Sequence, residues 1–340
     1  MTHIDPSKIM QIGMGFWASK TLLTAVNMDL FTFLAKGPKS GKEIQEQLNL
    51  HDRSLYDFLD TLVALGFLSR QGLKENATYS NAEDADLFLD KNKRSYIGGI
   101  LEMSNNRLYP FWNHLEEALK TGAPQNESKN GGASMFDAIY ADENVLKEFL
   151  HAMGGVQAGN FDFFAKNFDF STFKTHCDVG GSGGNLSIHI AKNNPHLISA
   201  TFDLPPVEPI ARGNIKELGL SDRISAKAGD FFTDDIPSAD LITMGNILHD
   251  WGTNEKKMLI QKAYKALPDN GTLVVIENII DNDRRKNAFG LMMSLNMLIE
   301  TTEGFDYSMA DFEVWAREAG FQHISIMPLT GPTSAIIARK

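Results

Sequence analysis

Apolar residues in the first third of the chain recur at intervals of three and four positions, which is the spacing of one helical face. One such run comprises Leu55, Phe58, Leu59, Leu62 and Val63. The pattern predicts a mostly helical segment from residue 9 to about residue 122.

Within this segment, residues 40–70 have the pattern of a short helix, a turn and a longer helix, and residues 66–82 that of a small hairpin. Ser40 and Glu43 have the spacing of a capping box, which would begin the first helix. This is the plan of a winged helix-turn-helix, a common DNA-binding motif. Residues 38–90, however, carry five basic and ten acidic side chains, which phosphate would repel. We therefore expect a packing or dimerisation role and no contact with nucleic acid.

From Thr175 onward, short apolar runs alternate with helical patterns. The predicted strands are residues 176–181, 198–204, 223–231, 239–245, 272–278, 323–329 and 334–340. Alternation of this kind predicts an α/β fold, with a mainly parallel seven-stranded sheet between two layers of helices. Only a short Gly/Pro turn separates the last two runs, so the last strand should enter antiparallel. We place this domain at residues 171–340, after a helical domain at 1–115 and connecting helices at 116–170.

The composition narrows the class of protein. The chain has 340 residues, 43% of them hydrophobic, and a formal net charge of −11, which disfavours nucleic acid and anionic lipid as partners. Cys177 is the only cysteine, so an intrachain disulfide is excluded and a reducing compartment fits. No apolar run approaches 18 residues and the first residues do not resemble a signal peptide. We expect a cytosolic protein that does not associate with membranes.

The first predicted strand ends in the stretch DVGGSGG, which begins at Asp178. Glycines between a strand and a helix let the backbone approach a ligand at the edge where open α/β sheets bind nucleotides. Asp203 ends the next strand, where an acid suits a ribose diol, and Asp230 precedes an aromatic residue after the third, which suits adenine. Together these positions predict an adenosine pocket. The residues expected to line it are Asp178, Gly180, Gly181, Asp203, Leu204, Gly229, Asp230, Phe231 and Asn246.

The glycines alone do not separate NAD from S-adenosylmethionine (SAM), since both carry adenosine. The dinucleotide fingerprint spaces its glycines differently and leaves room for a pyrophosphate, beside which Asp178 would sit badly. That carboxylate suits the cationic end of SAM. The antiparallel ending also favours SAM over NAD.

Six motifs, in this order and spacing, resemble those of the class I SAM-dependent O-methyltransferases of small phenolic compounds. They are DVGGSGG, FDLPPV, GDFF, ILHDW, VVIEN and REAGF. The similarity covers nearly the whole chain, and residues 296–312 and 331–335 most resemble bacterial members that modify aromatic polyketides. It implies a Rossmann-like methyltransferase domain, a winged-helix-like N-terminal dimerisation domain, a homodimer and a small aromatic substrate.

The stretch NILHDW places His249 just after the fourth predicted strand, at the edge where the ligand pocket is expected. A phenol with pKa about 10 is only about 0.1% ionised at neutral pH, so methyl transfer to its oxygen benefits from a base. The resemblance makes His249 that base, with Glu277 beside it and Asp306 in place of the family's second glutamate. Tyr307 stands where relatives often have arginine, and Ser182 replaces a loop glycine. Asp250 is expected to begin the next helix.

No metal is expected, because a lone histidine with an adjacent acid does not provide the convergent ligands a metal needs. The resemblance implies an apolar acceptor pocket, lined by Met153, Phe161, Met297 and Thr301. Two alternatives stay open: an NAD-linked enzyme on a similar sheet, and a SAM-binding relative that catalyses another step.

Overall fold

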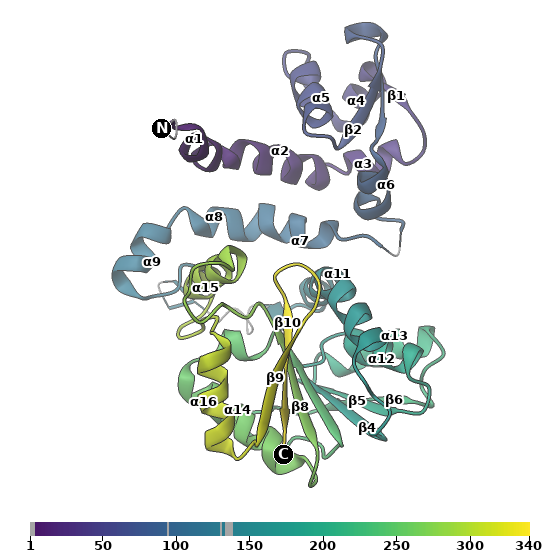
Figure 1. Ribbon diagram of the computed structural model, residues 1–340. Coiled ribbons are helices and arrows are strands. Elements are labelled where there is room, and N and C mark those ends of the chain that lie inside the picture. The colour runs from purple at the N-terminus through teal and green to yellow at the C-terminus, as the bar shows by residue number, and fades with distance from the viewer. Residues whose placement is uncertain (1–3, 94, 130, 133–138) are drawn as a thin grey trace. The chain divides into compact units, whose positions relative to one another are not determined.

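The computed structural model describes residues 4–93, 95–129, 131–132 and 139–340, and the chain divides into two compact units, residues 1–110 and 111–340 (Figure 1). Helices α9 (Leu115–Thr121) and α11 (Glu143–Asn167) lie in the region predicted to connect the two domains, and both belong to the second unit.

The first unit is mostly helical, as its apolar spacing predicts. Its helices are α1 (Ser7–Gly13), α2 (Gly15–Asn27), α3 (Leu30–Leu34), α4 (Gly41–Leu48), α5 (Leu55–Ala64), α6 (Glu83–Leu89) and α7 (Gly98–Met103); π-helical residues Ser104–Leu108 lead into α8 (Tyr109–Trp112). A small sheet has the order β1-β3-β2, from β1 (Lys39–Ser40), β2 (Leu68–Gln71) and β3 (Thr78–Asn81). The antiparallel β2–β3 pair confirms the predicted hairpin, and the capping box of Ser40 and Glu43 is formed.

The core of the first unit is built by the apolar face that the sequence shows. Leu55, Leu59 and Leu62 of α5 are buried together with Leu30 and Phe31 of α3. Helix α1, by contrast, has no buried residue, and Trp17 of α2 is 62% exposed. The N-terminal helices thus present apolar side chains that this unit does not itself cover.

The second unit contains a seven-stranded sheet of order β6-β5-β4-β7-β8-β10-β9. Its strands are β4 (Thr175–Val179), β5 (Ile198–Asp203), β6 (Ile224–Ala228), β7 (Leu241–Gly245), β8 (Thr272–Glu277), β9 (His323–Pro328) and β10 (Ser334–Arg339). Strands β4 to β8 pair in parallel, and β10 lies antiparallel between β8 and β9. The predicted mainly parallel sheet with an antiparallel last strand is confirmed.

Helices cover both faces of this sheet: α11, α12 (Asn185–Asn193) and α13 (Glu208–Glu217) lie on one side, and α14 (Thr253–Ala266) and α16 (Met309–Ala319) on the other (Figure 1). Strand β8 shows the reason, since all six of its residues are buried. Leu273 and Val275 join the core shared with α14 and α16, whereas Val274 and Ile276 join the core shared with α11 and α12. Alternate residues of a strand point to opposite faces, so a continuous apolar run needs cover on both.

Helix α15 (Ala288–Glu300) lies between β8 and α16 in the chain and is held by the segment that begins this unit. Trp112 Nε1 donates to Asn296 Oδ1 at 2.8 Å, Gln125 N to Ile299 O at 2.8 Å, and Asn126 Nδ2 to Glu300 O at 2.7 Å. The position of α15 therefore depends on residues 112–126.

Candidate active site

The loop between β4 and α12 leaves no room for side chains at Gly180 and Gly181. A Cβ on Gly181 would lie 2.0 Å from Thr201 Oγ1 and 2.9 Å from Asp178 Oδ2, and Gly180 has a φ of +66°. Ser182 adopts a φ of 53°, a left-handed conformation that favours glycine. Its N–H donates to Asp203 Oδ2 at 2.8 Å. The loop's backbone is thus held close to the sheet, where a ligand can approach it.

Two carboxylates, the buried Asp178 and the half-buried Asp203, stand at the ends of the adjacent strands β4 and β5. Asp203 also accepts from Leu204 N at 2.7 Å. Burial raises the pKa of Asp203 to about 6, although its two backbone hydrogen bonds oppose the shift. Burial raises the pKa of Asp178 to about 7, with a further contribution from the charge of Asp203. Both carboxyl groups are suited to a cationic or hydroxyl-bearing ligand, which would take the place of the water that burial removes from them.

The loop after β6 is fixed by local hydrogen bonds. Gly229 N donates to Asp203 O at 2.9 Å, and Phe232 N donates to Asp230 Oδ1 at 2.8 Å. Lys262 of α14 donates to the carbonyls of Phe231, at 2.7 Å, and Asp234, at 2.6 Å. The loop residues Phe231 and Phe232 pack edge-on against Trp251, with centroid distances of 6.0 and 4.6 Å.

Asn246 follows β7 and has a φ of 54°. Its Oδ1 is buried and has no hydrogen-bond partner among the residues that the structure describes. Because β6, β5, β4 and β7 are neighbours, Asp230, Asp203, Asp178 and Asn246 follow one another along the carboxyl edge of the sheet. The structure therefore brings the predicted adenosine-pocket residues to one edge.

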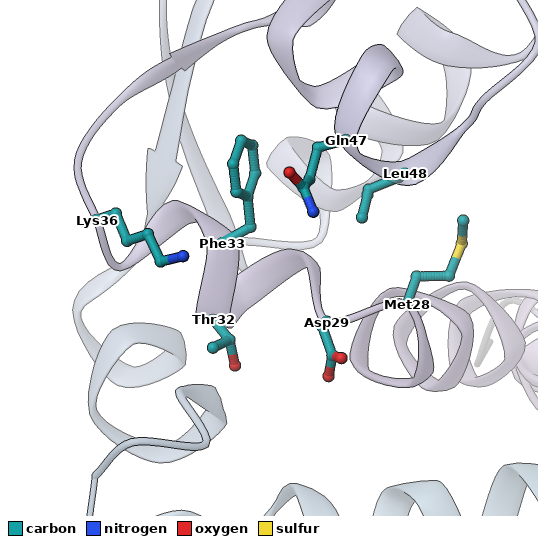
Figure 2. Close-up of a pocket in the computed structure, with 7 residues that line it drawn as sticks. All are labelled: Met28, Asp29, Thr32, Phe33, Lys36, Gln47 and Leu48. Atoms are coloured by element: carbon teal, nitrogen blue, oxygen red, sulfur yellow. The ribbon is translucent and has the colours of Figure 1, made fainter.

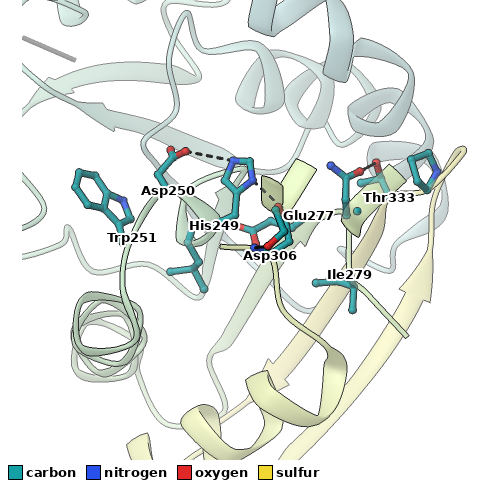
Figure 3. A network of polar contacts seen from close by, with 12 residues as sticks. His249, Asp250, Trp251, Glu277, Ile279, Asp306 and Thr333 are labelled. Carbon is teal, nitrogen blue, oxygen red and sulfur yellow. Dashed lines mark hydrogen bonds and ion pairs between the residues drawn. The ribbon is translucent and has the colours of Figure 1, made fainter. Parts of the chain in front are cut away.

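His249 lies in a single 3₁₀ turn, Leu248–Asp250, directly after this edge and is buried. Its Nδ1 lies 3.5 Å from Asp306 Oδ1 and its Nε2 lies 3.5 Å from Asp250 Oδ1 (Figure 3). The prediction that Asp250 begins the next helix is wrong, because the N-cap of α14 is Gly252. The carboxylate of Asp250 faces the imidazole instead.

Glu277 supports the backbone beneath the histidine and not its ring. Glu277 Oε1 accepts from Leu248 N at 2.7 Å and from His249 N at 3.2 Å. The side chain is buried, which raises its pKa, while the positive charge of His249 lowers it. Tyr307 is buried beside Glu277 and packs edge-on against Trp315, with a centroid distance of 5.1 Å. Asp250 and Asp306 therefore lie beside the imidazole ring, whereas Glu277 binds the backbone that carries it.

Electrostatics favour a positive charge on His249. Burial by itself lowers its pKa, but the charges of Asp250, Asp306 and Glu277 outweigh burial and raise the pKa to about 10. Burial in turn raises the pKa of Asp250 to about 6, against the pull of the His249 charge. In the protein alone, these carboxylates therefore favour the protonated form of the ring.

Lys256 is a member of this cluster that the sequence analysis missed. It is fully buried on α14, its Nζ donates to the carbonyl of Trp251, and Nζ lies 3.5 Å from the ring centroid of Phe305. Burial lowers its pKa to about 8, while Glu277, Asp306 and Asp250 oppose that shift. The sequence could have indicated this, because Lys256 falls on the apolar face of α14 with Leu259, Ile260 and Ala263. A lysine on a buried face needs hydrogen-bond or charge partners.

The predicted acceptor-pocket residues come from α11 and α15. Phe161 of α11 is buried, and a Cβ on Gly245 would lie 3.4 Å from its ring. Met153 is half-buried about two turns earlier on the same helix. Met297 of α15 is buried and accepts at its carbonyl from Thr301 Oγ1 at 2.8 Å. The Thr301 hydroxyl also accepts from Gly304 N, so it closes the end of α15.

Other features lie apart from this edge. No group of three or more His, Cys, Asp or Glu side chains in the described residues could hold a metal ion, and no described helix is long and apolar enough to cross a membrane. A hollow of about 390 Å³ in the first unit contains none of the predicted site residues (Figure 2). Its lining is Met28, Asp29, Thr32, Phe33, Lys36, Gln47 and Leu48.

Comparison with known protein families agrees with this geometry. The model of the O-methyltransferase domain matches residues 112–322, and the model of the O-methyltransferase dimerisation domain matches residues 10–91. The chain belongs to the O-methyltransferase family. The methyltransferase thus has the two parts that its sequence motifs predict.

Relatives of the methyltransferase are similar over nearly the whole chain. It is 39% identical over 340 residues to the tetracenomycin polyketide synthesis 8-O-methyl transferase TcmO of Streptomyces glaucescens, covering 100% of this chain and 98% of that one. It is 30% identical over 314 residues to the N,N-dimethyltransferase OxyT of Streptomyces rimosus, covering 92% and 90%. The structure of human N-acetylserotonin methyltransferase with SAM matches with a TM-score of 0.91 and 27% identity, covering 100% and 99%.

The chain is a SAM-dependent O-methyltransferase, and its own residues fit that cofactor. Gly180 and Gly181 of the loop exclude Cβ atoms where a ligand would approach, and the buried Asp178 and the half-buried Asp203 stand beside them. Ser182 Oγ and Asn246 Oδ1 are buried polar atoms without a partner in the described part of the chain. A ligand with hydroxyl and amino groups would satisfy these atoms.

Proposed function

We propose that this methyltransferase transfers a methyl group from SAM to a hydroxyl of a small aromatic molecule, with His249 as general base. The observation that carries the proposal is the imidazole of His249, buried at the carboxyl edge of the sheet and bracketed by Asp306 and Asp250 at 3.5 Å each. The aromatic class follows from the relatives, one of which is named for a polyketide. SAM supplies a methyl group made electrophilic by its sulfonium.

Residues of the chain position the base and take up the proton of the acceptor hydroxyl. The neutral ring donates through Nδ1–H to Asp306, which fixes the tautomer and leaves Nε2 with a lone pair. Nε2 takes the phenolic proton as the oxygen becomes the nucleophile, and Asp250 beside Nε2 stabilises the imidazolium that forms. Glu277 keeps the turn in place through its two backbone hydrogen bonds.

This mechanism requires His249 to lose the proton that it holds in the protein alone. A cation bound in the loops after β4 and β5 opposes the imidazolium charge and lowers the pKa of His249. Cofactor binding therefore shifts the ring from its raised pKa of about 10 in the free protein toward the neutral form that the proposed role requires.

The cofactor roles are proposed from the same edge. We assign Asp178 to the cationic methionine end, Asp203 with Leu204 to the ribose, and Asp230 with Phe231 to adenine. The backbone of Gly180, Gly181 and Gly229 and the side chain of Asn246 complete the site. Met153, Phe161, Met297 and Thr301 are assigned to the acceptor side, and residues 1–115 to a homodimer.

The test is incubation of the purified protein with SAM and a panel of phenols, catechols, enols and anilines, followed by mass spectrometry. A gain of one methyl group on an aromatic hydroxyl is expected, with about 10² or more lower turnover in His249→Ala. Methylation of anilines alone, or a His249→Ala variant as active as the unaltered enzyme, contradicts the proposal.

A further inference from the structure

Two hydrogen bonds join a buried histidine to the carboxylate of Asp178, and a third joins the same ring to a serine. His176 lies on β4, two residues before Asp178, and is 2% exposed. Its Nδ1 lies 3.1 Å from Ser199 Oγ of β5, and its Nε2 lies 2.9 Å from Thr243 Oγ1 of β7. Thr243 Oγ1 donates to Asp178 Oδ1 at 2.7 Å. The chain of contacts crosses three neighbouring strands and ends at the proposed cofactor edge.

The pairing of the strands explains this arrangement. His176 is opposite Ser199, and Asp178 is opposite Thr243 in the parallel ladders on either side of β4. His176 and Asp178 are two positions apart and so share one face of the strand. A histidine, a serine and a threonine in the middle of a buried sheet have little packing value unless their hydrogen bonds are satisfied. Here they satisfy one another.

The ionisation state of Asp178 determines which group donates in each of these hydrogen bonds. An ionised carboxylate can only accept, so Thr243 must use its single proton toward Asp178. The Thr243 oxygen then accepts from His176 Nε2–H, and Nδ1 accepts from the Ser199 hydroxyl. Burial lowers the pKa of His176 to about 3, so the ring is neutral and carries one N–H. Protonation of Asp178 at Oδ1 reverses every donor and moves the ring proton to Nδ1.

Asp178 depends on such support. Burial raises its pKa to about 7, the hydrogen bond from Thr243 opposes the shift, and the charge of Asp203 adds to it. Asp203 itself has a pKa raised to about 6 by burial. Near neutral pH, the two acids therefore compete for ionisation, and a directed donor selects the ionised form of Asp178.

We propose that His176 is a positioning residue that acts through Thr243 to present Asp178 as an ionised carboxylate to the cationic methionine end of SAM. The inference rests on the cofactor role proposed for Asp178. His176 lies outside all six motifs of the family, and in this role it does not contact the ligand.

The tautomer of His176 is the direct readout. The full-length protein labelled with ¹⁵N-histidine is titrated from pH 5.5 to 8.5, free and with saturating SAM, and the His176 ring signals are assigned with His176→Gln. The Nε2–H tautomer is expected throughout with SAM. In the free protein, it should give way to Nδ1–H as the pH falls through about 7. One tautomer that responds neither to pH nor to SAM overturns the inference.

Matched variants separate positioning from packing. The amide of His176→Gln can reach Thr243 as a donor, whereas His176→Asn is long enough only for Ser199, and Thr243→Val removes the donor to Asp178. The SAM affinity of His176→Gln, measured by calorimetry, should stay within about threefold of that of the unaltered protein. For His176→Asn and Thr243→Val at pH 6.5, the affinity should fall roughly ten- to a hundredfold, as expected for loss of a hydrogen bond to a charged group. The affinity of both variants should recover toward pH 8.5.

Equal and pH-independent losses in Gln and Asn would mean that His176 serves packing alone. Asp178→Asn is the control for the underlying assignment: unchanged SAM affinity in that variant removes Asp178 from the cofactor site. If Asp178→Asn weakens binding and the His176 and Thr243 variants do not, only the inference about His176 fails. Melting temperatures of all variants identify any that do not fold, in which case the tautomer measurement on the unaltered protein decides.

Discussion

His249 Nδ1 lies 3.5 Å from Asp306 Oδ1, and Asp306 stands in the short segment between α15 and α16. The Asp306 carboxylate therefore reaches the imidazole. Glu277 makes its contacts with the backbone N–H groups of Leu248 and His249. The ring and the turn that carries it are held by different acids.

Replacing His249 tests the base. His249→Ala should lower kcat by about 10² or more and leave SAM affinity within a few-fold, because a general base acts on the transition state. Raising the pH toward 10 should restore part of the variant's activity, since the phenol then ionises unaided. Steady-state kinetics and calorimetry at pH 7.5 and 9.5 check this. A joint loss of SAM binding and melting temperature, without alkaline rescue, would instead indicate a structural histidine.

The two further acids should differ when neutralised. Asp306→Asn keeps the side-chain shape but removes a charge beside Nδ1, so we expect about a tenfold or larger fall in kcat with little change in stability. Glu277→Gln weakens acceptance from two backbone N–H groups and should lower the free energy of unfolding by about 1–3 kcal/mol. Denaturant unfolding and kinetics on both variants check the contrast. Equal effects on kcat and on unfolding in the two variants would contradict the division of roles.

The raised pKa of His249 has a consequence for stability. Its folded-state pKa of about 10 lies above the ordinary value of 6.5, so the protonated ring stabilises the folded protein fully below pH 6.5. That contribution is lost progressively as the pH rises from 6.5 to 10. The difference in free energy of unfolding between the unaltered protein and His249→Gln should therefore shrink over this range. A difference that is constant from pH 6 to 10 shows that the ring is not an imidazolium in the free protein.

Asp203 should dominate the ribose contacts. Asp203→Ala removes a carboxylate that would bind two hydroxyls, and each such bond contributes roughly 1.5–3 kcal/mol. SAM affinity should fall by about 10² or more, measured by calorimetry. Asp235→Ala, near the same edge but outside the proposed site, is the control. If Asp203→Ala binds SAM with unchanged affinity, Asp203 does not bind the ribose.

The exposed N-terminal helices should be covered in solution. Ile9 is 75% exposed and Trp17 is 62% exposed, and the dimerisation model matches residues 10–91. We expect light scattering to find a dimer at micromolar concentration, and Trp17→Glu to shift it toward monomer because a charge would be buried at the interface. Lys8→Glu is a matched control on an exposed polar position. A monomer at all concentrations contradicts this expectation.

The sequence predicted the central strands β7 and β8 because they are buried on both faces and therefore appear as nearly uninterrupted apolar runs. It also predicted that Asp178, Asp203, Asp230 and His249 share one edge, since parallel strands end on the same side. It could not show which acid faces the imidazole. That depends on the 3₁₀ turn that rotates Asp250 toward Nε2 and on the path of residues 301–308, neither of which has a periodic signature.

Helix α15 has a consequence for altering the acceptor range of the enzyme. Its carbonyls and Asn296 accept from Trp112, Gln125 and Asn126, far away in the sequence. A graft that exchanges only α15 with that of a relative keeps the two backbone carbonyls but replaces the Asn296 side chain, which leaves the Trp112 N–H without its acceptor unless the relative has a suitable residue there. Chimaeras that transplant residues 112–126 together with 288–300 keep both partners of this hydrogen bond, so they should be more stable than chimaeras that receive α15 alone.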